Sequence, residues 1–100
     1  MTDIGAILEE RGKRYGDFMT HARITQELKE LAYSFANAQR TPLEADQSEA
    51  LDMIFHKIGR ILNGDPNYAD SWADIAGYAK LVADRLEEAE LKLKTYAEVG

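Results

Sequence analysis

Residues 70–97 read DSWADIAGYAKLVADRLEEAELKLKTYA, and their apolar spacing decides the fold. Apolar residues recur along this stretch at alternating intervals of three and four positions: Trp72, Ile75, Ala79, Val82, Leu86, Ala89, Leu93 and Tyr96. This spacing gathers them on one face of an α-helix. The stretch therefore predicts one long helix over about residues 70–97, roughly 40 Å from end to end.

The same helical period recurs upstream, in segments that turn signals separate. It predicts a short N-terminal helix over about residues 2–11, a second helix over about 18–39 and a third over about 44–62. Between them lie a basic turn at 11–17 that holds two glycines, a break at 40–42, and the pair Asn63-Gly64 followed by Pro66. No segment shows the period of a strand. We therefore expect a single all-α domain over residues 1–100, an antiparallel bundle of about four helices with a long C-terminal helix.

Polar residues at the breaks predict where helices begin. Asp17 is a candidate N-cap for the second helix. Two starts compete for the third: a capping box over residues 41–44, with Pro42 at the first helical position, and another over residues 46–49. The fourth helix is expected to begin at Asp70 or Ser71.

The predicted last helix is longer than the helix before it. It should therefore extend past its own bundle and leave Leu86, Leu93 and Tyr96 for another chain to cover. We expect a homo-oligomer that assembles through residues 70–97.

Composition excludes several classes of protein. The chain has 100 residues, 12 Lys plus Arg against 18 Asp plus Glu, a formal net charge of −6 and no Cys. Without Cys there is no disulfide scaffold, thiolate zinc site or Cys nucleophile. The acidic balance argues against nucleic acid as a partner. Because no long apolar run and no secretory pattern is found, we expect no membrane partner and a cytoplasmic location.

Four carboxylates suggest a metal site between the last two predicted helices. Glu49 and Asp52 are three residues apart on one helix, and Asp70 and Asp74 are four apart on the next. Carboxylates without Cys or paired His suit a hard cation, so the expected metal is Mg²⁺ or Mn²⁺. The alternative is that these side chains cap helix ends or face water, since acidic residues are favoured in a first helical turn.

Two basic groups suggest phosphate binding. Lys57 and Arg60 lie three apart on one helix, and Arg11, Arg14 and Tyr15 lie in the basic turn. Arginine grips a phosphate through two hydrogen bonds, lysine adds a point charge, and tyrosine can stack on a base. The alternative for both groups is an ordinary solvated surface. His21 and His56 are each interpreted as structural residues rather than catalytic bases.

Three motifs carry a resemblance to known families. RGKRYGDF at 11–18, HKIGRILNGDP at 56–66 and DSWADIAGY at 70–78 resemble a family of small phage and prophage proteins with no assigned activity. More distantly, Glu49-x-x-Asp52 and the segment led by Asp74 are similar to the metal motifs of MazG-type all-α nucleotide pyrophosphohydrolases. Those enzymes carry Glu three positions before the second Asp, where this chain has Ser71.

Together these features predict a phage-related protein that binds nucleotide phosphates. The MazG-type resemblance implies Mg²⁺-dependent hydrolysis of a nucleoside triphosphate to the monophosphate and pyrophosphate. Two alternatives stay open. One is an oligomer that sequesters a nucleotide signal of host defence without turnover, and the other is a helical oligomer that is structural or binds a host protein.

Overall fold

The protein is all-α in the computed structural model, which describes residues 3–39 and 41–99. These residues form four helices and no strand: α1 (Ile4–Tyr15), α2 (Phe18–Ala36), α3 (Ala45–Asn63) and α4 (Ala69–Val99). The all-α prediction is confirmed, as is the long last helix.

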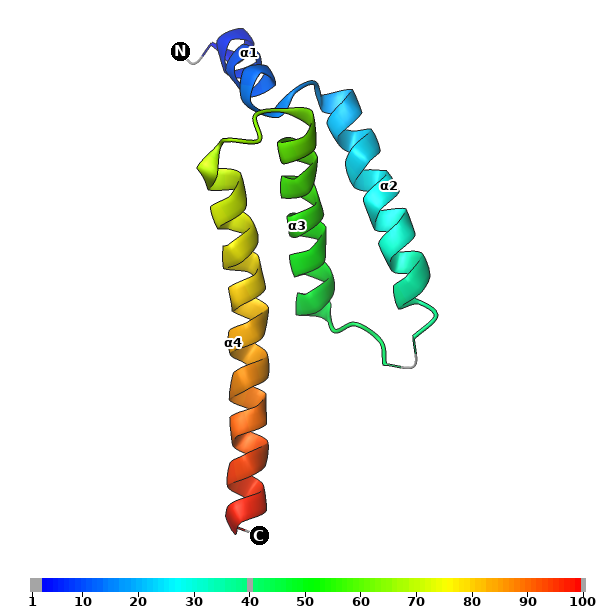
Figure 1. Ribbon diagram of the computed structural model, residues 1–100, viewed down its shortest axis with the longest axis vertical. Coiled ribbons are helices and arrows are strands. Elements are labelled where there is room, and N and C mark those ends of the chain that lie inside the picture. The colour runs from blue at the N-terminus through cyan, green and yellow to red at the C-terminus, as the bar shows by residue number, and fades with distance from the viewer. Residues whose placement is uncertain (1–2, 40, 100) are drawn as a thin grey trace.

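The helix α3 is the central element of the bundle. It packs against α2 on one side and α4 on the other, while α1 contacts α2 and α3 near their upper ends (Figure 1). Neighbouring helices α2, α3 and α4 run antiparallel, and α4 continues well past the lower ends of the other two (Figure 1). The molecule is elongated, with extents of 62 × 32 × 27 Å. None of the described helices combines the length and apolar character needed to cross a membrane.

The basic segment that was predicted as a turn is mostly helical. Arg11–Tyr15 form the last turn of α1, so the prediction of a turn over 11–17 is wrong for these residues. A helical Gly12 costs only ~1 kcal/mol relative to Ala, and cations are favoured at a helix C-terminus. The turn is confined to Gly16 and Asp17, and Asp17 caps α2 as predicted by accepting a hydrogen bond from Thr20 N–H at 2.9 Å.

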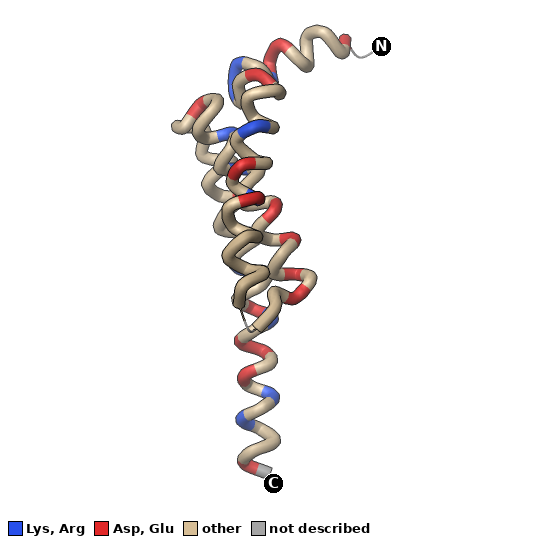
Figure 2. Tube along the Cα trace, turned by 90° about the vertical axis from the view of Figure 1, so that its right-hand side faces the viewer, with Lys and Arg blue, Asp and Glu red and all other residues tan. Residues whose placement is uncertain are grey.

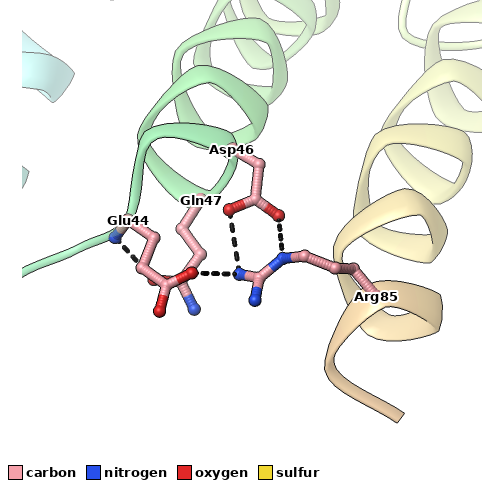
Figure 3. Close-up of polar contacts among 4 residues, drawn as sticks. All are labelled: Glu44, Asp46, Gln47 and Arg85. Carbon is pink, nitrogen blue, oxygen red and sulfur yellow. Dashed lines mark hydrogen bonds and ion pairs between the residues drawn. The ribbon is translucent and has the colours of Figure 1, made fainter. Parts of the chain in front are cut away.

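The start of α3 differs from both predicted capping boxes. The helix begins at Ala45 with Glu44 as N-cap, and Glu44 N–H donates to Gln47 Oε1 at 2.9 Å. The two residues form a local capping box, because the side chain of each accepts a hydrogen bond from the backbone N–H of the other. Arg85 of α4 binds Asp46 through two hydrogen bonds of 2.6 and 2.9 Å and pairs with Glu44 at 2.9 Å, which ties this end of α3 to α4 (Figure 3).

Two other helix limits also shift. The helix α2 ends at Ala36 rather than near 39, and α4 begins at Ala69, one residue before the predicted start.

The described bundle buries little apolar surface. Ala50 is the buried hydrophobic residue among the described side chains, whereas His21, Thr25, Lys57 and Ser71 are buried polar ones. The accessible surface is 7886 Å², against about 5,700 Å² for a compact monomer of this mass. The radius of gyration is 18.1 Å, against about 13 Å for a compact chain of this length.

Candidate functional site

A pocket lies where α1, α2 and α3 meet, and we name it the α1–α3 pocket. Its volume is about 430 Å³. It is lined by Leu8, Arg11, Gly12, Tyr15, Gly16, Asp17, Phe18, His21, His56 and Arg60. Figure 2 shows several basic segments at this end of the bundle, whereas acidic segments prevail further down.

The C-terminal end of α3 holds the α1–α2 turn in place. Asn63 Nδ2 donates to the carbonyl oxygens of Tyr15 and Asp17 at 3.1 and 2.8 Å. Gly16 has a φ of 76°, and a Cβ there would overlap Asn63. Positive φ is strained for any other residue type. Gly16 and Asn63 together fix the position of the α1–α2 turn against the end of α3, beside the pocket.

Two arginines make the pocket cationic. The Arg60 guanidinium lies over the Tyr15 ring, 4.1 Å from its centroid, and Arg11 lines the same pocket. The acidic lining residue is Asp17, whose hydrogen bond from Thr20 lowers its pKa and keeps it ionised. Two arginines and one aspartate leave a local formal charge of +1 in a chain whose net charge is −6.

A pair of histidines forms one wall of the pocket. Nε2 of His21 and Nδ1 of His56 are 3.1 Å apart, and the two rings meet edge to face. Burial first, and then the charge of Arg60, lower the pKa of both imidazoles, that of His56 to about 4. Both are therefore neutral near pH 7. Sequence reasoning treated the two as separate residues and missed the pair.

The other predicted phosphate ligands lie outside the α1–α3 pocket. The Arg14 guanidinium lies 4.6 Å from the centroid of the Tyr68 ring and 3.5 Å from Glu10, beside a neighbouring hollow. Lys57 is 9% exposed and pairs with Asp74 of α4 at 3.0 Å. Lys57 and Arg60 therefore face different neighbours of α3 and do not share one anion.

The four carboxylates predicted to bind a metal have different surroundings. Asp52 Oδ1 accepts a hydrogen bond from Tyr33 OH at 2.7 Å, whereas Asp74 pairs with Lys57. Burial and the bond to Asp52 raise the pKa of Tyr33 to about 12. Glu49 is exposed, and Asp70 is exposed in the first turn of α4. Within residues 3–39 and 41–99, no group of three or more His, Asp or Glu side chains is arranged to hold a metal ion. The geometry therefore does not support the magnesium site, which remains a prediction from sequence.

Comparison with known proteins gives one match. Residues 4–86 match the protein family described as Domain of unknown function (DUF6378). No curated protein and no solved structure matches the chain. The matched span contains every residue of the α1–α3 pocket and ends where α4 leaves the bundle.

Proposed function

We propose that this chain, which belongs to the DUF6378 family, binds a phosphorylated ligand that carries a flat ring, such as a nucleotide, in the α1–α3 pocket. The observation that supports this most directly is the Arg60 guanidinium held over Tyr15 beside Arg11. A guanidinium that is already oriented by an aromatic ring loses little freedom when it binds phosphate.

The size and lining of the pocket suit such a ligand. Its volume of about 430 Å³ lies within the usual range for small-molecule sites, about 300–1,000 Å³. Phe18 lines the pocket with its ring stacked 6.5 Å from that of His21, and because it is 80% exposed, most of its surface is available to a base. Stacking of this kind contributes about 1–3 kcal/mol and tolerates any base.

Binding without turnover is favoured over hydrolysis. Two of the carboxylates in the predicted metal site already have partners, since Asp52 accepts a hydrogen bond from Tyr33 and Asp74 pairs with Lys57. Stoichiometric binding suits a protein that withholds a nucleotide signal from its receptor. This role is the first of the two alternatives to hydrolysis that the sequence leaves open.

Calorimetric titration with ribo- and deoxynucleoside mono- and triphosphates, with and without EDTA, tests this proposal. We expect binding that survives EDTA, with the ligand recovered intact. Arg60→Gln should weaken it about tenfold or more, because a charge-assisted bidentate contact is lost. Arg23→Gln is the matched control, since Arg23 is exposed on α2 and its partner among the described residues is Glu27.

Two results would contradict the proposal. One is equal binding by the Arg60→Gln and Arg23→Gln variants. The other is Mg²⁺-dependent release of pyrophosphate that Asp74→Asn abolishes while the variant remains folded, which would restore the pyrophosphohydrolase hypothesis.

A second property, self-association, rests on a different observation. The accessible surface of 7886 Å² exceeds that of a compact monomer by about 2,200 Å², an amount typical of an obligate interface. Leu93 and Tyr96 lie on the part of α4 that passes the bundle, and are 70% and 80% exposed. We infer a homo-oligomer through α4.

A further inference from the structure

A second hollow lies directly beside the α1–α3 pocket, and we name it the Tyr68 hollow. Its volume is about 300 Å³, and it is lined by Ile7, Glu10, Arg11, Arg14, Tyr15 and Tyr68. Arg11 and Tyr15 also line the α1–α3 pocket. The two hollows therefore meet at these two side chains of α1, and a ligand that contacts them in one hollow lies next to the other.

The loop between α3 and α4 brings Tyr68 to this place. The loop lies next to the end of α1 (Figure 1), and Asp65 N–H donates to the carbonyl oxygen of Arg14 at 2.6 Å. A Cβ at position 64 would overlap the backbone of Arg14 and Tyr15, so the close approach requires Gly64. The loop thereby places the Tyr68 ring 6.3 Å from the Tyr15 ring, measured between centroids.

The Tyr68 hollow repeats the chemistry of the α1–α3 pocket. In the α1–α3 pocket, the Arg60 guanidinium lies 4.1 Å from the centroid of the Tyr15 ring. In the Tyr68 hollow, the Arg14 guanidinium lies 4.6 Å from the centroid of the Tyr68 ring. The lining of the Tyr68 hollow holds two arginines and one glutamate, which leave a local formal charge of +1. Each hollow thus offers an aromatic ring, an oriented guanidinium and a positive charge.

The ion pair between Arg14 and Glu10 leaves the Tyr68 hollow open to a ligand. Arg14 Nε is 3.5 Å from Glu10 Oε1, and the two side chains are 44% and 69% exposed. Exposed pairs of this kind contribute little to stability. The planar guanidinium also keeps its remaining N–H groups and its face for other contacts.

We propose that the two hollows together bind one ligand in which two flat rings are joined through phosphate, that is, a dinucleotide in the broad sense. One ring lies in the α1–α3 pocket, according to the proposed function on which this inference rests. Arg11, where the hollows meet, binds the linking phosphate, and the second ring lies against Tyr68 and Arg14. Because the two halves are linked, binding of the first raises the effective concentration of the second.

Calorimetric titration of the wild type compares linked and single nucleotides. The single ligands are AMP and ATP. The linked ligands are phosphoadenylyl-adenosine, whose rings are joined through one phosphodiester, and diadenosine tetraphosphate, whose rings are joined through a chain of phosphates. We expect one of the linked ligands to bind about tenfold or more tightly than ATP, and the tighter of the two indicates the length of the linkage. Affinities of both linked ligands no higher than that of ATP would overturn the inference.

Two substitutions in the Tyr68 hollow test where the second ring binds. Arg14→Gln and Tyr68→Leu should each weaken binding of the linked ligand about tenfold and change binding of ATP less than about twofold. Lys13→Gln is the matched control, since it removes a positive charge from the same turn of α1 and Lys13 is not among the residues that line either hollow. Circular dichroism checks that each variant is folded. If Arg14→Gln binds the linked ligand as tightly as Lys13→Gln does, the second ring does not lie in the Tyr68 hollow.

Failure of this inference can be distinguished from failure of the proposed function. If ATP binds and Arg60→Gln weakens its binding, but linkage to a second nucleoside adds nothing, then the α1–α3 pocket is a mononucleotide site and the inference alone is wrong. If neither single nor linked nucleotides bind the wild type, both are wrong.

Discussion

Lowering the pH should destabilise the fold through the histidine pair. In the unfolded chain an imidazole has a pKa near 6.5, whereas burial and the charge of Arg60 lower the pKa of folded His56 to about 4. Between these values the unfolded state binds a proton that the folded state does not. The free energy of unfolding is therefore unaffected above about pH 6.5 and falls as the pH drops towards 4. His21 shifts in the same direction.

The size of the loss follows from the shift in pKa. A pKa drop from 6.5 to about 4 corresponds to at most about 3.4 kcal/mol. Solvent screening at the partly exposed His56 reduces the expected loss to about 1–2 kcal/mol.

Urea unfolding followed by circular dichroism between pH 7 and pH 4.5 measures this effect. Wild type and His56→Gln should be compared, because carboxylate titration contributes equally to both and cancels in the difference. We expect the wild type to lose stability faster than the variant below pH 6.5. Parallel pH dependences for the two proteins would refute the reasoning, since His56 would then not be held neutral by its surroundings.

Three further predictions concern the fold and the assembly. Gly16→Ala should lower the free energy of unfolding in urea by about 2 kcal/mol or more, because Gly16 has a positive φ. Gly77→Ala in α4, where a Cβ would meet nothing within 4 Å, should be neutral or stabilising. Equal effects of the two substitutions would contradict the requirement for glycine in the α1–α2 turn. Arg85→Ala should lower the melting temperature more than Lys80→Ala, since Arg85 joins α4 to the start of α3, whereas the partner of Lys80 among the described residues is Asp84 of the same helix. The reverse order would show that the ion pairs of Arg85 contribute nothing to stability. In light scattering coupled to size-exclusion chromatography, the mass of the wild type should exceed that of the monomer, and Leu93→Glu should lower the measured mass. A monomeric wild type would rule out the interface through α4.

Much of the fold could be predicted from local pattern. The apolar spacing from Trp72 to Tyr96 predicted α4, and Asp17 was predicted as the cap of α2, because helical period and capping depend on residues within a turn or two of each other. The end of α1 was wrong, whereas the third helix, predicted over about 44–62, is observed at Ala45–Asn63 with a different capping box. The helix α1 continues through Gly12 to Tyr15 because a helical glycine costs little. The capping box of Glu44 and Gln47 is a local feature that the prediction missed.

The site was predictable only in part. Arg11, Tyr15 and Arg60 were each singled out from the sequence, and the structure brings these three together in one pocket. Lys57 was grouped with Arg60 because they share a helix face. Since α3 has neighbours on both sides, Lys57 meets α4 and Arg60 meets α1.

The sequence by itself determined the all-α class, the long last helix and the capped entry to α2, because each depends on short-range periodicity and hydrogen bonding. Only the tertiary structure decided which side chains share a pocket. His21 and His56 are 35 residues apart and no local rule joins them. Their contact, like the pairing of Asp52 with Tyr33 and of Asp74 with Lys57, follows from which face of α3 each neighbouring helix covers, and that is set by packing over the whole bundle.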